Sequence, residues 1–143
     1  MVIKRITAEQ AYPLRQVILR PDGTLQDCMF AGDELATTHH YGYFDGAELV
    51  AIASLYARNS EGYRGRGCQL RSMAVAENKQ GQGFGHKLLA GICQKLATDT
   101  DYLWANARVS AITFYQQADF EINPAVFDIT DVGPHQHIVK RFK

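Results

Sequence analysis

The apolar positions of the chain form several short alternating runs and one longer helical stripe. The stripe follows Gly83 and advances by steps of four, one, three, one and three residues; it consists of Phe84, Leu88, Leu89, Ile92, Cys93 and Leu96. These steps keep the apolar side chains on one face of a helix with 3.6 residues per turn. The sequence therefore predicts an amphipathic helix that packs on a sheet.

The first part of the chain predicts a strand, a helix and a long loop. Apolar and polar side chains alternate enough over residues 2–6 to predict a short strand. Thr7 is a suitable N-cap for a helix that runs to about residue 19. Pro13 lies inside this helix, so we expect either a later start or an irregular first turn. Residues 20–38 contain few apolar positions and predict a long loop with at most one short helix.

The middle of the chain predicts three consecutive antiparallel strands. The runs 40–44 and 48–58 are joined by Asp45-Gly46, which is a strong signal for a β-hairpin. A glycine-rich turn then leads into the run 68–76.

The last part predicts a parallel crossover and a closing pair of strands. Residues 102–107 read as a buried strand, and a strand, a helix and a second strand in this order imply a right-handed parallel crossover. Ser110 can cap a short helix that ends near residue 117. Residues 120–129 and 135–142 then close the chain as two strands. The expected fold class is mixed α/β (α+β), with helices layered on one sheet.

Composition narrows the class of protein. A length of 143 residues with 46% hydrophobic content predicts a single domain over residues 1–143. The 15 basic and 15 acidic residues balance and form no long run of one sign, so we expect neither a nucleic-acid nor a membrane partner. No stretch reaches the length of a signal peptide core or a membrane span, which predicts a soluble cytoplasmic protein. The three cysteines read as buried thiols in a reducing compartment, and no metal is implied.

The segment Gln80-Gly81-Gln82-Gly83-Phe84-Gly85 raises the question of a ligand, because it leads directly into the predicted helix. Its spacing fits neither the Walker loop nor the dinucleotide fingerprint. Bare backbone N–H groups at the start of a helix nevertheless favour an anion, and phosphate is the best candidate. The alternative is that the glycines only turn the chain from strand to helix.

The same segment fits the pattern Q/R-x-x-G-x-G/A and resembles the pyrophosphate-binding loop of the GCN5-related N-acetyltransferase (GNAT) superfamily. Downstream, Ala111 to Tyr115 followed by Phe120 is similar to the A-x-x-x-Y-x-x-x-G-F segment of that superfamily, with Asp119 in the glycine position. The match covers residues 68–120, and residues 12–21 and 133–138 show a fainter similarity to small uncharacterised bacterial members. It implies a GNAT-type acyl-CoA N-acyltransferase fold, with a central mixed sheet of about six or seven strands flanked by helices.

The resemblance also implies a site for acetyl-coenzyme A. In the superfamily the strand before the loop splays from the next parallel strand, and the pantetheine arm lies in the opening. Asn106 could reach the pantetheine amides, although an ordinary residue at the edge of the core is the alternative reading. The implied cofactor-binding residues are Met73, Ala74, Val75, Gln80, Gly81, Gln82, Gly83, Phe84, Gly85, His86 and Asn106.

Tyr115 occupies the position from which relatives protonate the leaving thiolate, and a phenol with a pKa of about 10 suits that role. A backbone N–H near Met73 or Ala74 would stabilise the oxyanion if a strand bulge frees it. The proton acceptor stays open between five side chains, namely Glu34, His39, His40, His135 and His137.

The expected function is N-acetylation of a small-molecule or peptide amine by direct transfer in a ternary complex. An acyl-cysteine route through Cys68 or Cys93 is disfavoured, because neither has a histidine close in sequence. The alternatives are a non-catalytic coenzyme A or acyl-CoA sensor or scaffold, and a nucleotide-phosphate binder of another fold.

Two features leave the acceptor undefined. The acidic residues of loop 22–34 would attract a cationic amine, whereas Arg71 would favour a carboxylate. The sequence also leaves the oligomeric state open, including a homodimer.

Overall fold

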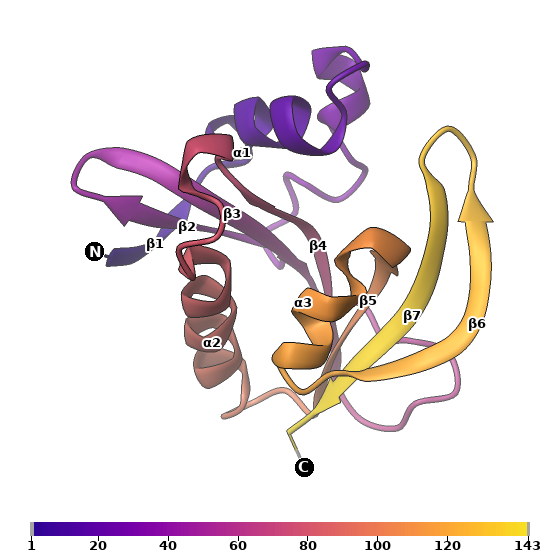
Figure 1. Cartoon of the computed structure of the whole chain (residues 1–143). Coiled ribbons are helices and arrows are strands. Elements are labelled where there is room, and N and C mark those ends of the chain that lie inside the picture. Colours follow the sequence, from indigo (N-terminus) through magenta and orange to yellow (C-terminus); the bar gives the residue numbers. More distant parts are fainter. Residues whose placement is uncertain (1, 143) are drawn as a thin grey trace.

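The computed structural model describes residues 2–142 and contains one seven-stranded mixed sheet in the order β1-β2-β3-β4-β5-β7-β6 (Figure 1). The strands are β1 (Val2–Ile6), β2 (His39–Asp45), β3 (Glu48–Tyr56), β4 (Gly67–Val75), β5 (Tyr102–Arg108), β6 (Glu121–Ile129) and β7 (Gly133–Arg141). The β4–β5 pair is parallel, and the other neighbours are antiparallel. The expected sheet of six or seven strands and its parallel crossover are therefore confirmed.

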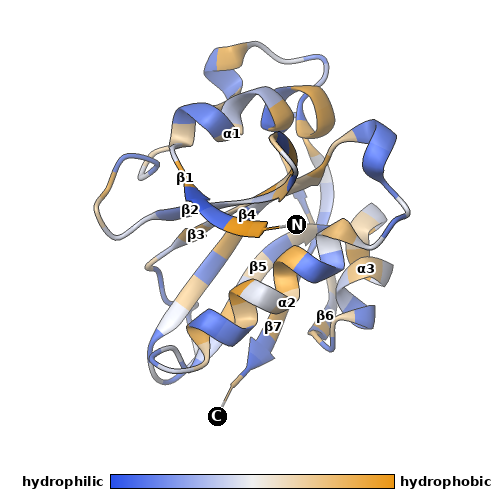
Figure 2. Cartoon of the chain, turned by 90° about the vertical axis from the view of Figure 1, so that its left-hand side faces the viewer, coloured by the Kyte–Doolittle hydropathy of each residue, from blue (hydrophilic) through white to orange (hydrophobic). Residues whose placement is uncertain are grey.

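Three α-helices cover the two faces of this sheet: α1 (Ala8–Leu14), α2 (Phe84–Leu96) and α3 (Ile112–Gln117). Figure 2 shows α1 and α2 on opposite sides of the first strands. The buried stripe of α2 packs with α3 and the sheet in the larger core, while Ala11 of α1 packs with Ile6 and Ile52 in a smaller one. The helical periodicity after Gly83 thus marked the buried face correctly.

The N-terminal helix begins at Ala8, so the expectation of a later start is wrong. Thr7 and Gln10 form a reciprocal capping box, with the Thr7 hydroxyl accepting from the Gln10 N–H at 3.1 Å. Pro13 disturbs the far end instead. Because proline donates no backbone hydrogen bond and crowds the preceding turn, the α-helix gives way to a π-helical stretch, Arg15–Leu19.

Three short 3-10 helices complete the secondary structure: Leu25–Cys28 in the long loop, Glu77–Lys79 before α2, and Val109–Ala111 before α3. The first is the single short helix expected in loop 20–38. The predicted cap at Ser110 is wrong, because the chain already turns at Val109 and Ser110 lies inside that 3-10 helix. Among residues 2–142, no side chain caps α3.

The three cysteines, Cys28, Cys68 and Cys93, are buried free thiols, as expected. Within residues 2–142, no helix is both long and apolar enough to cross a membrane.

Candidate functional site

The β4 and β5 strands separate part of the way along their length. They are paired at Gly67, Cys68 and Gln69, and beyond that point the two strands share no register pair. A bulge in β4 accompanies the separation: Ser72 has a left-handed φ of 60°, and the register with β3 shifts at this point. The splay that the GNAT resemblance implied is present, and so is a bulge of the kind on which the oxyanion site depends. Two cavities open beside them.

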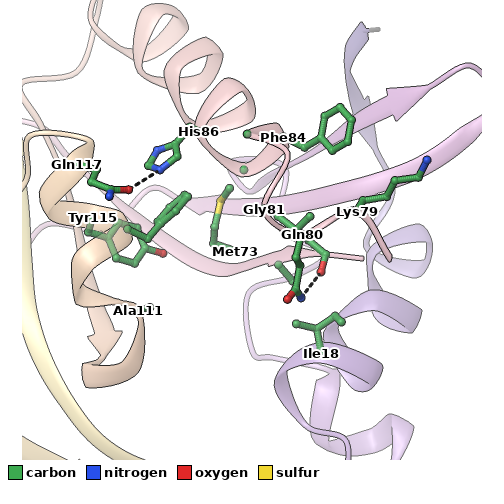
Figure 3. A pocket seen from close by; sticks show the side chains of 15 residues that line it. Ile18, Met73, Lys79, Gln80, Gly81, Phe84, His86, Ala111, Tyr115 and Gln117 are labelled. Atoms are coloured by element: carbon green, nitrogen blue, oxygen red, sulfur yellow. Dashed lines mark hydrogen bonds between the residues drawn. The ribbon is translucent and has the colours of Figure 1, made fainter. Parts of the chain in front are cut away.

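The first cavity has a volume of about 530 Å³ and lies between the end of β4, the loop before α2, and α3 (Figure 3). Nine of the eleven predicted cofactor-binding residues line it. The two exceptions are Gln82 and Asn106. The structure therefore gathers most of the predicted set around one hollow.

The loop before α2 presents bare backbone to the first cavity. Gly81 and Gly83 have φ values of 77° and 84°, and a Cβ atom on either would meet nothing within 4 Å. The N–H groups of residues 81–86 have no hydrogen-bond acceptor among residues 2–142, since the first helical bond runs from the Lys87 N–H to the Gly83 carbonyl. These donors and the N-terminal end of the helix dipole favour an anion here.

Side chains hold this loop in shape. Gln80 Nε2 donates to the Val75 carbonyl at 3.0 Å and so ties the loop to the end of β4 (Figure 3). Gln82 donates to the Asn78 carbonyl at 3.3 Å and is exposed outside the cavity lining. A Cβ atom on Gly85 would lie 3.1 Å from side-chain atoms of Val75 and Phe114, so glycine allows close packing at that position.

His86 joins α2 to α3. Its ring stacks on Phe114 with 4.3 Å between centroids, and Nε2 lies 3.1 Å from Oε1 of Gln117. These contacts fix the wall of the first cavity that lies across from Gln80 and Gly81 (Figure 3).

Tyr115 stands at the junction of the first and second cavities, and Met73 and Ala111 line both cavities with it. The Tyr115 ring is buried and makes edge-to-face contacts with Phe114 and Phe120. Burial raises the pKa of its hydroxyl above the ordinary tyrosine value, so the group keeps its proton. Its hydroxyl has no hydrogen-bond partner among residues 2–142, which leaves the proton available to a ligand.

The second cavity also has a volume of about 530 Å³ and lies beyond this junction. Asn106 is exposed on β5 and lines this second cavity instead of the first. Its contact with the pantetheine amides stays a prediction. Ser72 lines the second cavity too, and its hydroxyl is a buried group without a hydrogen-bond partner in the described part of the chain.

Sequence reasoning missed most of the basic lining of the second cavity. Besides Arg71, it includes Arg20, Arg58 and Arg108. For Arg71 the sequence did contain a signal. Side chains alternate along a strand, so Gln69 and Arg71, two residues apart, are expected on the same face of β4. No local pattern pointed to Arg20, which reaches the cavity from the long loop.

Among the five candidate proton acceptors, His135 lines the second cavity and the other four line neither cavity. The His135 ring is buried, and Nδ1 lies 2.7 Å from the Gly133 carbonyl oxygen. Because a carbonyl only accepts, Nδ1 carries the hydrogen, and Nε2 of the neutral ring bears the lone pair. By contrast, His40 is bound to Ser54 and to the Asp33 carbonyl, and His137 is stacked between Tyr63 and Trp104.

A buried charge network fixes the long loop beside the second cavity. Arg15 forms two hydrogen bonds with the Asp33 carboxylate, at 2.8 and 3.0 Å, and the Tyr56 hydroxyl donates to the same carboxylate at 2.5 Å. Burial alone would raise the pKa of Asp33, but the hydrogen bonds from Arg15, Tyr56 and the Phe30 N–H outweigh it and lower that pKa below the ordinary value. Asp33 therefore serves the fold and does not face the cavity.

Comparison with known proteins agrees with this geometry. Residues 36–122 match the family model described as the acetyltransferase (GNAT) domain. The uncharacterized N-acetyltransferase YitI of Bacillus subtilis is 29% identical over 140 residues, which cover 93% of this chain and 91% of YitI.

Two solved structures share the fold. FeeM, an N-acyl amino acid synthase from uncultured soil microbes, superposes with a TM-score of 0.79 at 14% identity. The match covers 99% of this chain and 90% of the FeeM chain. An aminoglycoside 6'-N-acetyltransferase complexed with coenzyme A superposes with a TM-score of 0.78 at 11% identity. The match covers 100% of this chain and 98% of the aminoglycoside acetyltransferase. The chain therefore belongs to the GNAT acetyltransferase family and is an N-acetyltransferase that uses acetyl-coenzyme A.

Proposed function

We propose that the protein acetylates an amine by direct transfer in a ternary complex, with acetyl-coenzyme A in the first cavity and the acceptor in the second. The observation that carries this proposal is the meeting of the two cavities at Met73, Ala111 and Tyr115. Two reactants bound in the two cavities would meet at this point, where a buried phenol carries a proton.

The residues of the first cavity fit the cosubstrate. The unpaired N–H groups of residues 81–86 would hold its pyrophosphate, and Gly81 and Gly83 leave room for phosphate oxygens against the backbone. The part of β4 beyond Gln69 has no β5 partner among residues 2–142, so the main chain of Met73 and the N–H of Val75 are available to the pantetheine amides. Acetyl-coenzyme A supplies an acyl group activated as a thioester.

The chain itself contributes charge stabilisation and proton transfer. Tyr115 Oη donates a proton to the departing sulfur, and its raised pKa keeps that proton in place at neutral pH. A backbone N–H at the Ser72–Met73 bulge stabilises negative charge on the acyl oxygen, since the ladder to β3 is interrupted there. His135 Nε2 accepts the proton of the acceptor ammonium, directly or through water.

A covalent acyl-cysteine route has less support. Cys68 and Cys93 are buried and line neither cavity, and burial raises the pKa of Cys68 to about 12. A thiol with that pKa is almost wholly protonated at neutral pH and is a poor nucleophile. Direct transfer requires neither cysteine.

A ligand-binding experiment tests the proposal against the nucleotide-binder alternative. In a thermal-shift panel, coenzyme A and acetyl-coenzyme A should stabilise the protein by roughly 2.7 kcal/mol at about a hundred times their dissociation constants. ATP and NAD should give a much smaller shift. Stabilisation by ATP or NAD without coenzyme A would overturn the proposal. Binding of coenzyme A with no thioester consumption across a broad set of amines would instead favour the sensor function.

A further inference from the structure

The second cavity is strongly basic. Four arginines line it, and no aspartate or glutamate of residues 2–142 does so; the four are Arg20, Arg58, Arg71 and Arg108. The four arginines differ in how far other groups already compensate their charges. Arg20 and Arg108 also border a neighbouring cavity with Asp22, Asp27 and Asp131, and Arg108 donates to the Leu19 carbonyl at 2.6 Å. Arg58 is exposed and donates to Gln69 at 3.0 Å.

Among residues 2–142, neither Arg20 nor Arg71 has a hydrogen-bonded side-chain partner, but Arg20 borders the acidic neighbouring cavity and Arg71 does not. The Arg71 guanidinium carbon lies 4.2 Å from the ring centroid of Phe30 and 5.4 Å from that of Tyr56, so two aromatic faces hold the group in place. Burial lowers its pKa from the ordinary arginine value, yet arginine stays charged at neutral pH. Among residues 2–142 its N–H groups have neither a hydrogen-bond acceptor nor an ion-pair partner.

The nearby carboxylate of Asp33 is already occupied. Both of its oxygens accept hydrogen bonds from Arg15, and it also accepts from the Tyr56 hydroxyl and the Phe30 N–H. The same network places Phe30 against Arg71. The loop therefore positions a half-buried cation in the cavity without neutralising it, and a half-buried cation of this kind favours an anionic ligand.

We propose that the acceptor is a compact amine that also carries a carboxylate or a phosphate, and that Arg71 binds this anionic group. The inference rests on the proposed function, in which the acceptor occupies the second cavity. Arg71 precedes Met73 by two residues on β4, a distance of about 7 Å or less along a strand. Arg71, Met73 and Tyr115 all line the second cavity, so an acceptor whose anionic group binds Arg71 and whose amine lies at the junction is expected to be compact, as a small amino acid is.

The anion site can be tested without turnover. The protein without cosubstrate is titrated with N-acetylglycine, its neutral amide N-acetylglycinamide, and inorganic phosphate, and binding is followed by NMR shifts of the second-cavity residues. We expect an anionic probe to bind at least about tenfold more tightly than the amide, and Arg71→Gln to remove this preference. Arg64→Gln, at an exposed arginine outside both cavities, should leave it unchanged. Equal binding of acid and amide, or a preference that survives in Arg71→Gln, would overturn the proposal.

A second arm measures acetylation with matched acceptor pairs: glycine with glycinamide, β-alanine with β-alaninamide, and phosphoethanolamine with ethanolamine. We expect the anionic member of a pair to have at least about a tenfold higher kcat/KM, and the preferred pair distinguishes carboxylate from phosphate. Arg71→Gln should cut kcat/KM for that member and spare the neutral one. Equal or better acetylation of the neutral members would overturn the inference and leave the proposed function intact.

The failure of the proposed function has a different signature. In that case the wild-type protein would not bind coenzyme A, or would acetylate no amine in the panel, and the anion titration would then decide the Arg71 site by itself. An unchanged melting temperature of Arg71→Gln relative to the wild-type protein shows in either case that the variant is folded.

Discussion

Gln69 of β4 and Trp104 of β5 form the last register pair between these two strands. Before this pair the strands are hydrogen-bonded neighbours, and after it each keeps a partner on its outer side only, β3 for β4 and β7 for β5. The inner edges that remain have unpaired backbone groups; the first cavity lies along the edge of β4, and the second lies along the edges of both strands. The position of this pair thus sets where a ligand can extend the sheet.

Coenzyme A should slow amide hydrogen exchange at Met73, at Val75 and at residues 81–86, because its arm and pyrophosphate accept hydrogen bonds from these N–H groups or shield them. Exchange at residues 67–69 should change little, since those residues are already in the parallel ladder. NMR exchange measurements with and without coenzyme A resolve the individual amides. Protection confined to the second cavity would contradict the assignment of the first cavity to the cosubstrate.

Gly83→Ala should weaken coenzyme A binding by roughly tenfold, about 1.4 kcal/mol, because it places a Cβ in the phosphate cradle and strains a left-handed residue. Gly46→Ala is the matched control. Gly46 also has a positive φ, 62°, with nothing within 4 Å of its Cβ position, but it lies in the β2–β3 hairpin. Both variants should lose about 1 kcal/mol of stability. Titration calorimetry and urea unfolding separate the two effects, and an equal loss of coenzyme A affinity in both would count against the cradle.

Tyr115→Phe should lower kcat by about a hundredfold and leave the affinity for coenzyme A unchanged. Because burial raises the pKa of Tyr115, the protonated form, which is the active acid, persists to higher pH than for an ordinary tyrosine. Wild-type turnover should consequently show no decline from tyrosine ionisation between about pH 8 and 10. Tyr63→Phe, outside both cavities, is the control for a lost hydroxyl. An unchanged kcat in Tyr115→Phe would remove the proposed acid.

His135→Gln should reduce kcat/KM at neutral pH by about a hundredfold, because the acceptor ammonium then lacks its proton acceptor. The deficit should shrink as the pH rises, since a growing fraction of the amine enters already deprotonated. His39→Gln, whose ring lines neither cavity, should behave like the wild-type protein. A deficit that is constant across the pH profile would assign His135 a purely structural role.

Asp33→Asn should lower the free energy of unfolding by about 3–5 kcal/mol, because it leaves Arg15 as a buried charge without its partner. The exposed neighbouring variant Glu34→Gln should change it by less than about 0.5 kcal/mol. The folded-state pKa of Asp33 is lowered, so its contribution is fully present above about pH 4 and is lost as the pH falls through the lower folded value. Urea unfolding at neutral and acidic pH should show that this loss is absent in Asp33→Asn.

The local elements of the chain followed from its sequence. The stripe after Gly83, the N-cap at Thr7 and the hairpin at Asp45-Gly46 are set by interactions between residues a few positions apart, and the structure contains all three. The resemblance carried by Gln80 to Gly85 and by Tyr115 also located the first cavity, because backbone conformation at glycines and helix starts is a local property.

The second cavity was decided by tertiary structure. Arg20, Arg71 and Arg108 come from a loop and two different strands, and nothing in their local sequence indicates that they meet. The same holds for Asp33, which the sequence presents as a free acidic residue of a loop. In the folded protein its carboxylate forms an ion pair with Arg15, which is 18 residues away along the chain. Electrostatics depends on distance in space and on burial, and folding alone sets both quantities for residues that are remote along the chain.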